Sequence, residues 1–426
     1  MLNILKKLFF VILILCSCTY FNYSNTVFIN IDTVSNNIKI NKNQENNYDS
    51  VLQNFENNKY NLTKNKQKSK EVIRILSLDG GGTRAYLQAK FLEKFCQYAN
   101  IENINEYFDL IVCTSAGSLN GITLANGIKP VKMQKFFREI GPWIFTIRSV
   151  KDIFSKDASV PSNKPNTFQK LLLMTFSNPF YKADSKDSNY GDAILRKTLT
   201  GIFENKLLQS IKTKIVITAY NDSKYYPMIF TNAELNNIPN IFKDVKIVDA
   251  VMATISFPIY FPSTNLCAPC DNKLPVQKIV DGGLFQRNPS LLAFTIANEL
   301  YPSAKKYCLL SVGTGIGRIG LNTDTNEPEP STSSLSQYMR LYDIVTTNSD
   351  ITNDIFLKQI SKSNTNSNLS YYRFNILFNN KNFDKDDMDT STPEFFDYLD
   401  EVVTEQYEND KSKINEFIKQ SDFYSL

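Results

Sequence analysis

Residues 72–121 read VIRILSLDGGGTRAYLQAKFLEKFCQYANIENINEYFDLIVCTSAGSLNG. The first seven are an apolar run that predicts a buried strand, and a glycine turn follows at residues 79–84. Apolar residues then recur at mostly helical spacing over residues 85–100. A second buried strand is predicted over residues 108–113, followed at once by a serine. Two strand ends of one sheet can therefore bring backbone N–H groups and a nucleophilic side chain to the same place, as acyl transfer requires.

The same alternation of strands and helices continues towards the C-terminus. Short apolar runs predict strands over residues 214–219, 226–231, 278–280 and 306–312. Helical patterns occupy residues 116–126, 130–139, 190–203, 246–255 and 290–300. After residue 317 the pattern is mainly helical, over 335–361 and 392–420, with a strand predicted at 371–378. Several strands are apolar throughout, which is typical of a sheet covered on both faces. The chain is therefore predicted to contain one α/β domain with a largely parallel sheet.

The charge balance of the chain does not favour nucleic acid as a partner. The chain has 426 residues, and its formal net charge of +4 arises from 47 basic and 43 acidic residues. This balance, without a dense basic block, argues against binding to nucleic acid. The hydrophobic share of 42% and the charged share of 21% are those of an ordinary globular protein.

The first 18 residues have the pattern of a signal peptide. Lys6 and Lys7 precede the apolar run Leu8–Leu15, and small residues follow. The alternative is an uncleaved anchor, although the run is short for a membrane span. Residues 15–18, LCSC, also resemble a bacterial lipoprotein box with Cys18 as the lipidated residue. We therefore expect an exported protein, either secreted or anchored to a membrane.

Residues 19–70 are predicted to be a disordered polar linker. They are rich in Asn, Lys, Ser and Tyr and contain few apolar clusters. The globular domain is predicted to extend over residues 71–420 and to include the C-terminal helices.

The glycine turn Asp79-Gly80-Gly81-Gly82-Thr83-Arg84 follows a predicted strand and precedes a predicted helix. Without side chains, three successive glycines let backbone N–H groups converge on a ligand. The helix N-terminus adds positive potential. Such a turn suits an oxyanion and equally a phosphate, and it can also be no more than a tight connection.

Ser115 lies in the sequence Cys113-Thr114-Ser115-Ala116-Gly117. This is the GxSxG pattern with cysteine in place of the first glycine. In that pattern a sharp strand-to-helix turn lifts the serine above the sheet, and small residues on either side let strand and helix pack tightly. The alternative is an ordinary helix start capped by Ser or Thr.

The chain contains no histidine. A Ser-His-Asp triad is therefore excluded, and a serine nucleophile needs another base. Asp281, at the end of a predicted strand and followed by Gly282-Gly283, offers a carboxylate. A free aspartate has a pKa of roughly 3.9 and is a weak base at neutral pH, but hydrogen-bond contact with the serine can compensate. A pH profile without a limb near about 6.5 is expected. An ordinary Asp-Gly turn is the alternative.

Taken together, these residues resemble the patatin-like phospholipase family. Its pattern is a DGGGxR/K loop, a GxSxG elbow and a DGG or DGA turn, which together form a Ser–Asp dyad without histidine. Four further stretches are similar to the family: ITAYNDSKYYPMIF, ISFPIYFPS, FQRNPS and LLSVGTG. The resemblance runs from Val72 to the C-terminal helices and implies a three-layer α/β fold. It implies Ser115 as the nucleophile, Asp281 as its proton acceptor and an oxyanion hole formed by Gly80, Gly81, Gly82 and Arg84.

The resemblance implies a lipid acyl hydrolase of the phospholipase A type. Its substrates would be membrane phospholipids or glycerolipids at a membrane surface, and no metal or organic cofactor would be required. The only CxxC, Cys267 to Cys270, has too few accompanying ligands for a structural zinc site. Protein partners are not indicated.

Two other functions fit part of the pattern. An ATP-binding protein of the actin or sugar-kinase type can also contain DGGGT, but there the loop turns back into a second strand, whereas here a helix is predicted. A patatin homologue that binds lipid without hydrolysing it would retain the fold, and Cys113 in the elbow favours it. The aromatic run at residues 136–145 is either a membrane-facing patch or, more commonly, buried core.

Overall fold

The computed structural model describes residues 70–145, 192–236, 242, 244–258, 260–267, 276–316, 334–362, 368–378 and 388–421, with the side chains of 334–346 excepted. These residues fall within the unit Asn65–Leu426. The predicted signal peptide and almost all of the predicted linker lie outside the described residues, so both assignments stay predictions. No helix in the described part of the chain is both long and apolar enough to cross a membrane.

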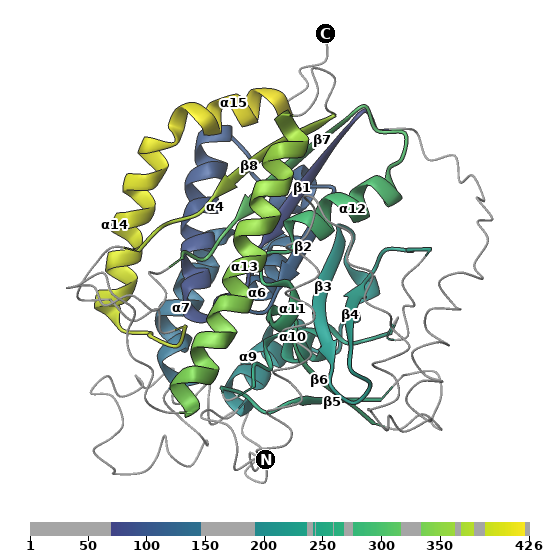
Figure 1. Ribbon diagram of the computed structural model, residues 1–426, viewed down its shortest axis with the longest axis vertical. Helices are drawn as coiled ribbons and strands as arrows, with labels where there is room; N and C mark the ends of the chain where they lie inside the picture. Colours follow the sequence, from purple (N-terminus) through teal and green to yellow (C-terminus); the bar gives the residue numbers. More distant parts are fainter. Residues whose placement is uncertain are drawn as a thin grey trace, which may run out of the picture. The chain divides into compact units, whose positions relative to one another are not determined.

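An eight-stranded sheet forms the centre of the fold, with the order β5-β6-β3-β2-β1-β7-β8 and β4 paired with β3 (Figure 1). The pairs β3–β2, β2–β1, β1–β7 and β7–β8 are parallel. The strands are β1 (Val72–Leu78), β2 (Leu110–Thr114), β3 (Lys214–Asn221), β4 (Tyr226–Thr231), β5 (Thr264–Leu266), β6 (Gln277–Asp281), β7 (Lys306–Val312) and β8 (Leu369–Phe374). The predicted α/β fold with a mostly parallel sheet is confirmed.

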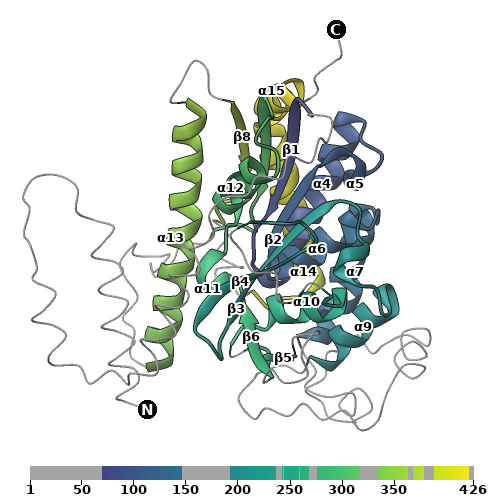
Figure 2. The same ribbon diagram turned by 90° about the vertical axis from the view of Figure 1, so that its right-hand side faces the viewer.

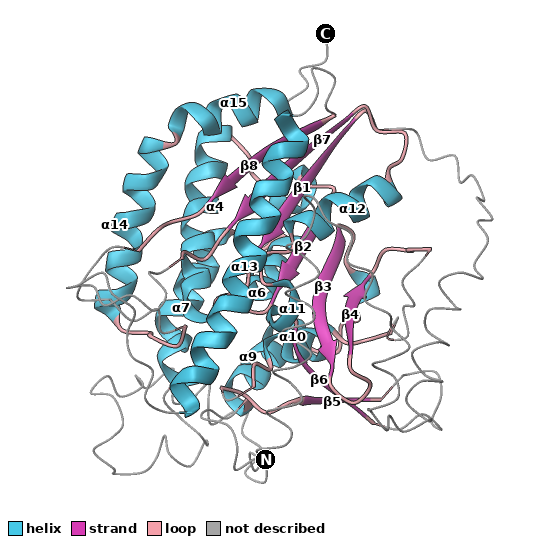
Figure 3. Ribbon diagram, in the orientation of Figure 1, coloured by secondary structure: helices cyan, strands magenta, loops and turns pink. Residues whose placement is uncertain are grey.

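Helices cover both faces of this sheet (Figures 1, 2 and 3). On one face lie α4 (Tyr86–Ala99), α6 (Ala116–Ala125), α7 (Pro130–Ile144), α9 (Ala193–Phe203), α10 (Ile247–Ile255), α14 (Pro393–Asn409) and α15 (Lys411–Ser421). On the other lie α12 (Ser290–Leu300) and α13 (Ser334–Lys362). The short elements are η1 (Gly82–Ala85), α5 (Ile104–Tyr107), η3 (Leu208–Ser210) and α11 (Gly283–Gln286).

The alternation of side chains along β1 explains the two layers of helices. Ile73 and Ile75 belong to the apolar cluster on the α12 side, whereas Leu76 and Leu78 belong to the larger cluster under α4 and α6. Successive side chains of a strand point to opposite faces. A strand that is apolar throughout therefore needs a cover on each face, and the three-layer arrangement supplies it.

Most predicted elements agree with the structure, but α7 is longer than predicted. The helical pattern was expected to end at residue 139, before Gly141 and Pro142, whereas α7 continues to Ile144. Proline removes one N–H donor from a helix. Trp143 and Ile144 are nevertheless buried in the last turn of α7, and their burial favours its continuation. The aromatic run at residues 136–145 thus contributes to the core and to the cavity at Ser115. Phe137, Trp143 and Ile144 are buried, so the membrane-facing interpretation does not apply to them.

The edge of the sheet beyond β3 is antiparallel. β6 pairs with β3 antiparallel through only three residue pairs, among them Ala219 with Asp281. Parallel strands end at one edge, but β6 runs the other way. Asp281 reaches the carboxyl edge of the sheet because β6 pairs only with the last residues of β3, so its own last residue lies beside Ala219. The short β5 and α11 were not predicted.

Candidate active site

Ser115 lies on the sharp turn between β2 and α6, in a backbone conformation that is rare for residues other than glycine (φ 51°, ψ −130°). Its N–H donates to Thr254 Oγ1 at 2.8 Å. A Cβ atom at Gly117 would lie 2.5 Å from the carbonyl oxygen of Asp79, so α6 approaches the end of β1 as closely as a glycine allows. These are the features of a nucleophile elbow, in which strain holds the serine above the sheet.

Cys113, which replaces the first glycine of the elbow pattern, is accommodated by a glycine on α6. Its side chain is fully buried, and a Cβ atom at Gly121 would lie 2.8 Å from its Sγ. The Cys113 side chain therefore occupies the space that a side chain at residue 121 would fill, one helical turn after Gly117 on α6. Burial raises the pKa of the Cys113 thiol to about 12, which makes it an inert packing group.

Asp281 lies beside Ser115. Ser115 Oγ donates to Asp281 Oδ2 at 2.5 Å, and the N–H of Gly283 donates to Asp281 Oδ1 at 2.6 Å. The carboxyl group is 2% exposed, and burial raises its pKa to about 7 although both hydrogen bonds oppose the rise. This revises the expectation for the pH profile, because a carboxyl group with this pKa titrates where a histidine would.

Two of the three loop glycines, Gly81 and Gly82, lie against neighbours that leave no room for side chains. A Cβ atom at Gly81 would lie 2.1 Å from Thr314 Oγ1, and one at Gly82 would lie 1.8 Å from the carbonyl oxygen of Met388. Gly80 donates its N–H to Arg287 O at 3.0 Å. Within the described residues, no acceptor is found for the N–H groups of Gly81 and Gly82, which both line the cavity at Ser115. These two N–H groups are therefore the candidates for binding an oxyanion at this end of the cavity.

The two arginines near this loop have different positions. Arg84, expected beside the oxyanion, is buried, and its Nε donates to the carbonyl oxygen of Gly81 at 3.5 Å. It does not line the cavity at Ser115, whereas Arg287 does. Arg287 was missed, although the stretch FQRNPS that contains it was recognised, because nothing in the sequence relates residue 287 to residue 80.

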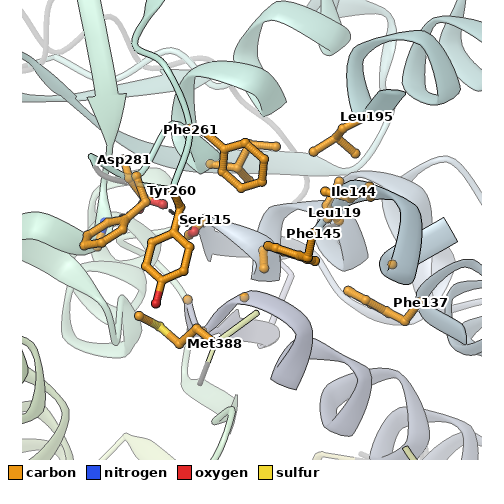
Figure 4. A pocket seen from close by; sticks show the side chains of 18 of the residues that line it. Ser115, Leu119, Phe137, Ile144, Phe145, Leu195, Tyr260, Phe261, Asp281 and Met388 are labelled. Carbon is orange, nitrogen blue, oxygen red and sulfur yellow. Dashed lines mark hydrogen bonds between the residues drawn. The ribbon is translucent and has the colours of Figure 1, made fainter. Parts of the chain in front are cut away.

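An apolar cavity opens at the serine, with about 730 Å³ of empty space that includes some open to solvent. Figure 4 shows Ser115 and Asp281 at one end, with Phe145 and Leu119 beyond them and Leu195 and Phe137 further along. The other lining residues include Phe136, Gly141, Ile144, Ile255, Phe257, Tyr260, Phe261 and Met388. The apolar lining, with the polar groups gathered at one end, suits a ligand that is largely apolar.

A buried ion pair lies under the glycine loop. Asp79 Oδ2 and Oδ1 accept from Arg373 Nη2 and Nη1 at 2.5 and 3.2 Å, and both side chains are almost fully buried. Arg373 Nη1 also donates to Ser311 Oγ at 2.6 Å. The pair connects the first residue of the loop, at the end of β1, to β8. Arg373 was not singled out from the sequence, because it lies 294 positions from Asp79.

Comparison with known proteins identifies the family of the chain. A family model for patatin-like phospholipases matches residues 76–294, just over half of the chain. Patatin-like protein 2 of Arabidopsis thaliana is 27% identical over 265 residues, which are 57% of this chain and 60% of that protein. The cGAMP-activated phospholipase of Vibrio cholerae is 28% identical over 260 residues, 58% of this chain and 65% of that protein. The chain thus matches less than two thirds of the length of these relatives.

Among solved structures, VipD from Legionella pneumophila aligns over 82% of this chain and 72% of its own, with 10% identity and a TM-score of 0.38. The family match, together with the glycine loop, the serine elbow and the Asp-Gly-Gly turn in the expected order, identifies the class. The chain belongs to the patatin-like phospholipase family.

Proposed function

We propose that this chain hydrolyses fatty-acyl esters of phospholipids or related glycerolipids, as a phospholipase of the A type. The observation that supports this most strongly is the 2.5 Å contact between Ser115 Oγ and Asp281 Oδ2 at one end of an apolar cavity. The loop DGGGTR continues into η1 and α4 and does not turn back into a second strand, which argues against the actin or sugar-kinase alternative.

In the proposed acylation step, Ser115 Oγ attacks the acyl carbonyl carbon while its proton passes to Asp281 Oδ2. The carbonyl oxygen becomes negatively charged and accepts hydrogen bonds from the N–H groups of Gly81 and Gly82. When this tetrahedral intermediate collapses, the ester C–O bond breaks and the alcohol leaves with the proton from Asp281. The acyl chain remains attached to Ser115 and lies along the apolar cavity.

In the proposed deacylation step, water attacks the acyl-serine and gives its proton to Asp281. Collapse releases the fatty acid, and the proton returns to Ser115 Oγ. The pKa of about 7 for Asp281 suits both directions of transfer, because a base titrating near the working pH can accept and return a proton.

The proposal is tested with a fluorophosphonate probe and a phospholipid hydrolysis assay. The probe should label wild type at residue 115, and Ser115→Ala should lose both labelling and fatty-acid release. Ser118→Ala is the matched control, since Ser118 is a buried serine on the same helix. It should retain activity. A folded wild-type protein that binds lipid but is neither labelled nor active would instead be a non-catalytic homologue.

We also propose export with action at a membrane surface, on the basis of the signal-like residues 1–18 and Cys18. Mass spectrometry of the protein from its native source should show a shortened N-terminus, with a lipid on Cys18 in a bacterial host. An intact Met1 in a cytosolic fraction would contradict it.

A further inference from the structure

The carbonyl oxygen of Gly80 accepts hydrogen bonds from two side chains outside the glycine loop. Thr314 Oγ1 donates at 2.7 Å and Arg287 Nε donates at 3.2 Å. The N–H of Gly80 donates to the carbonyl oxygen of Arg287 at 3.0 Å. Both backbone polar groups of Gly80 are therefore held by residues that follow β6 and β7. All three residues are buried or line the cavity at Ser115.

The orientation of the Gly80 carbonyl determines that of the next N–H group. The two belong to one planar peptide unit, and in a trans peptide they point in opposite directions. The described residues contain no cis peptide bond. With its carbonyl held towards Thr314 and Arg287, the unit turns the N–H of Gly81 to the other side. Gly81 lines the cavity together with Ser115, so this N–H is available to an oxyanion.

Arg287 is itself held in place from α13. Its Nη1 lies 3.7 Å from Asp350 Oδ2, and its Nη2 donates to the carbonyl oxygen of Gly315 at 3.2 Å. Asp350 is 2% exposed, and its carbonyl oxygen accepts from Asn288 Nδ2 at 3.1 Å. A planar guanidinium that is bonded at several edges has little freedom to rotate. Arg287 therefore presents its Nε to Gly80 in a single orientation.

We propose that Arg287 and Thr314 form a positioning clamp that aims the N–H of Gly81 at the oxyanion formed on the acyl carbonyl. This inference rests on the proposed function. The clamp acts through the backbone of Gly80 and needs no contact with the substrate. It should therefore affect the transition state, where the oxygen is charged, more than the bound ester.

The experiment compares turnover with the binding of two inhibitors that share one acyl chain. A trifluoromethyl ketone forms a charged tetrahedral adduct with the serine, whereas the corresponding methyl ether only fills the cavity. Thr314→Val removes one donor with little change of shape, and Arg287→Lys removes the donor to Gly80 but keeps the charge. Loss of one oxyanion donor typically costs about 10²–10³ in rate. Since the clamp acts indirectly, we expect kcat to fall about 10- to 100-fold, with little change in KM.

Under the proposal, the affinity for the trifluoromethyl ketone falls by the same factor as kcat/KM, and the affinity for the methyl ether is unchanged. Thr314→Ser, which keeps the hydroxyl, should restore most of the activity. Thr213→Val and Arg74→Lys are matched controls that also remove a side-chain donor to a distant backbone carbonyl. Both should leave kcat and the two affinities unchanged.

Other results would overturn the clamp. Arg287 and Thr314 would have a merely structural role if the control variants lost as much kcat as the clamp variants. The same would follow if kcat fell while the affinity for the trifluoromethyl ketone was unchanged, or if KM alone changed. If wild type neither hydrolyses esters nor reacts with a fluorophosphonate at Ser115, the proposed function itself fails and the clamp fails with it. An active, labelled wild type with fully active Thr314→Val and Arg287→Lys variants would reject the clamp alone.

Discussion

The tripeptide Asp-Gly-Gly occurs at the end of β1 (residues 79–81) and again at the end of β6 (residues 281–283), in two different environments. Asp79 is bonded twice to Arg373 and does not line the cavity. Asp281 is bonded to Ser115 and does line it, and no Lys or Arg of the described residues forms an ion pair with it.

The difference between the two turns shows that identical residues take different roles in different environments. Burial raises the pKa of both carboxyl groups, but at Asp79 the Arg373 guanidinium opposes the rise and binds both oxygens, which suits a structural role. A buried carboxylate without a cation has a raised pKa and can exchange a proton with a hydroxyl group. The glycines differ as well. Gly81 lines the cavity, whereas Gly282 packs against Thr218, whose Oγ1 would lie 2.2 Å from an added Cβ atom.

The largest expected effect separates the two aspartates by activity. Asp281→Asn keeps the shape but accepts no proton, so acylation should fall by about 10²–10⁴-fold. Asp79→Asn, measured on the folded fraction, should lose far less, because Asp79 contacts neither Ser115 nor the cavity. Stopped-flow acylation with a chromogenic ester measures both. Near wild-type turnover in Asp281→Asn would exclude this residue as the base.

The second expected effect is on stability, and here Asp79→Asn should lose more than Asp281→Asn. Asp79→Asn leaves Arg373 buried without its anion, which should lower the free energy of unfolding by about 3–5 kcal/mol. Asp281→Asn breaks no ion pair and should leave that free energy unchanged or higher. Urea denaturation monitored by fluorescence measures both.

A double variant sharpens this prediction. Asp79→Asn combined with Arg373→Met should recover part of the loss, because the unpaired charge is gone. If Asp79→Asn is as stable as Asp281→Asn, the ion pair contributes nothing to the fold.

The smallest expected effect is the dependence of kcat/KM on pH. Because burial raises the pKa of Asp281 to about 7, the fraction of ionised base falls at lower pH. We expect kcat/KM to be level at alkaline pH and to fall about tenfold per pH unit below about 7. The same shift makes the contribution of Asp281 to stability decrease as the pH rises from about 4 to about 7, since the folded state binds the proton more tightly. A profile that stays level down to pH 5 would contradict the raised pKa.

Continuous local patterns were sufficient for much of the fold. The predicted bounds of β1, β4, β7 and α12 match the structure, because each is a mainly apolar run with polar residues, glycine or proline at its ends. The elbow at Ser115 and the turn at Asp281 were also recognisable, since both are short motifs. β5 and α11 are too short to show a period.

The roles of individual site residues depended on distant contacts. Cys113 counted against the elbow in the sequence, but Gly121 accommodates it in the structure. Arg84 belongs to the expected motif yet does not line the cavity, whereas Arg287 does.

The sequence by itself determined the order of strands, loops and helices, the absence of histidine and the presence of a serine elbow and a carboxylate turn. Those features follow from local spacing and residue chemistry. The tertiary structure alone decided that β6 is antiparallel, that Arg373 pairs with the aspartate of one Asp-Gly-Gly turn and that Ser115 lies beside the aspartate of the other. The physical reason is that desolvation, ion pairing and the packing of glycines against distant backbone depend on which segments meet in space, and local spacing does not encode that.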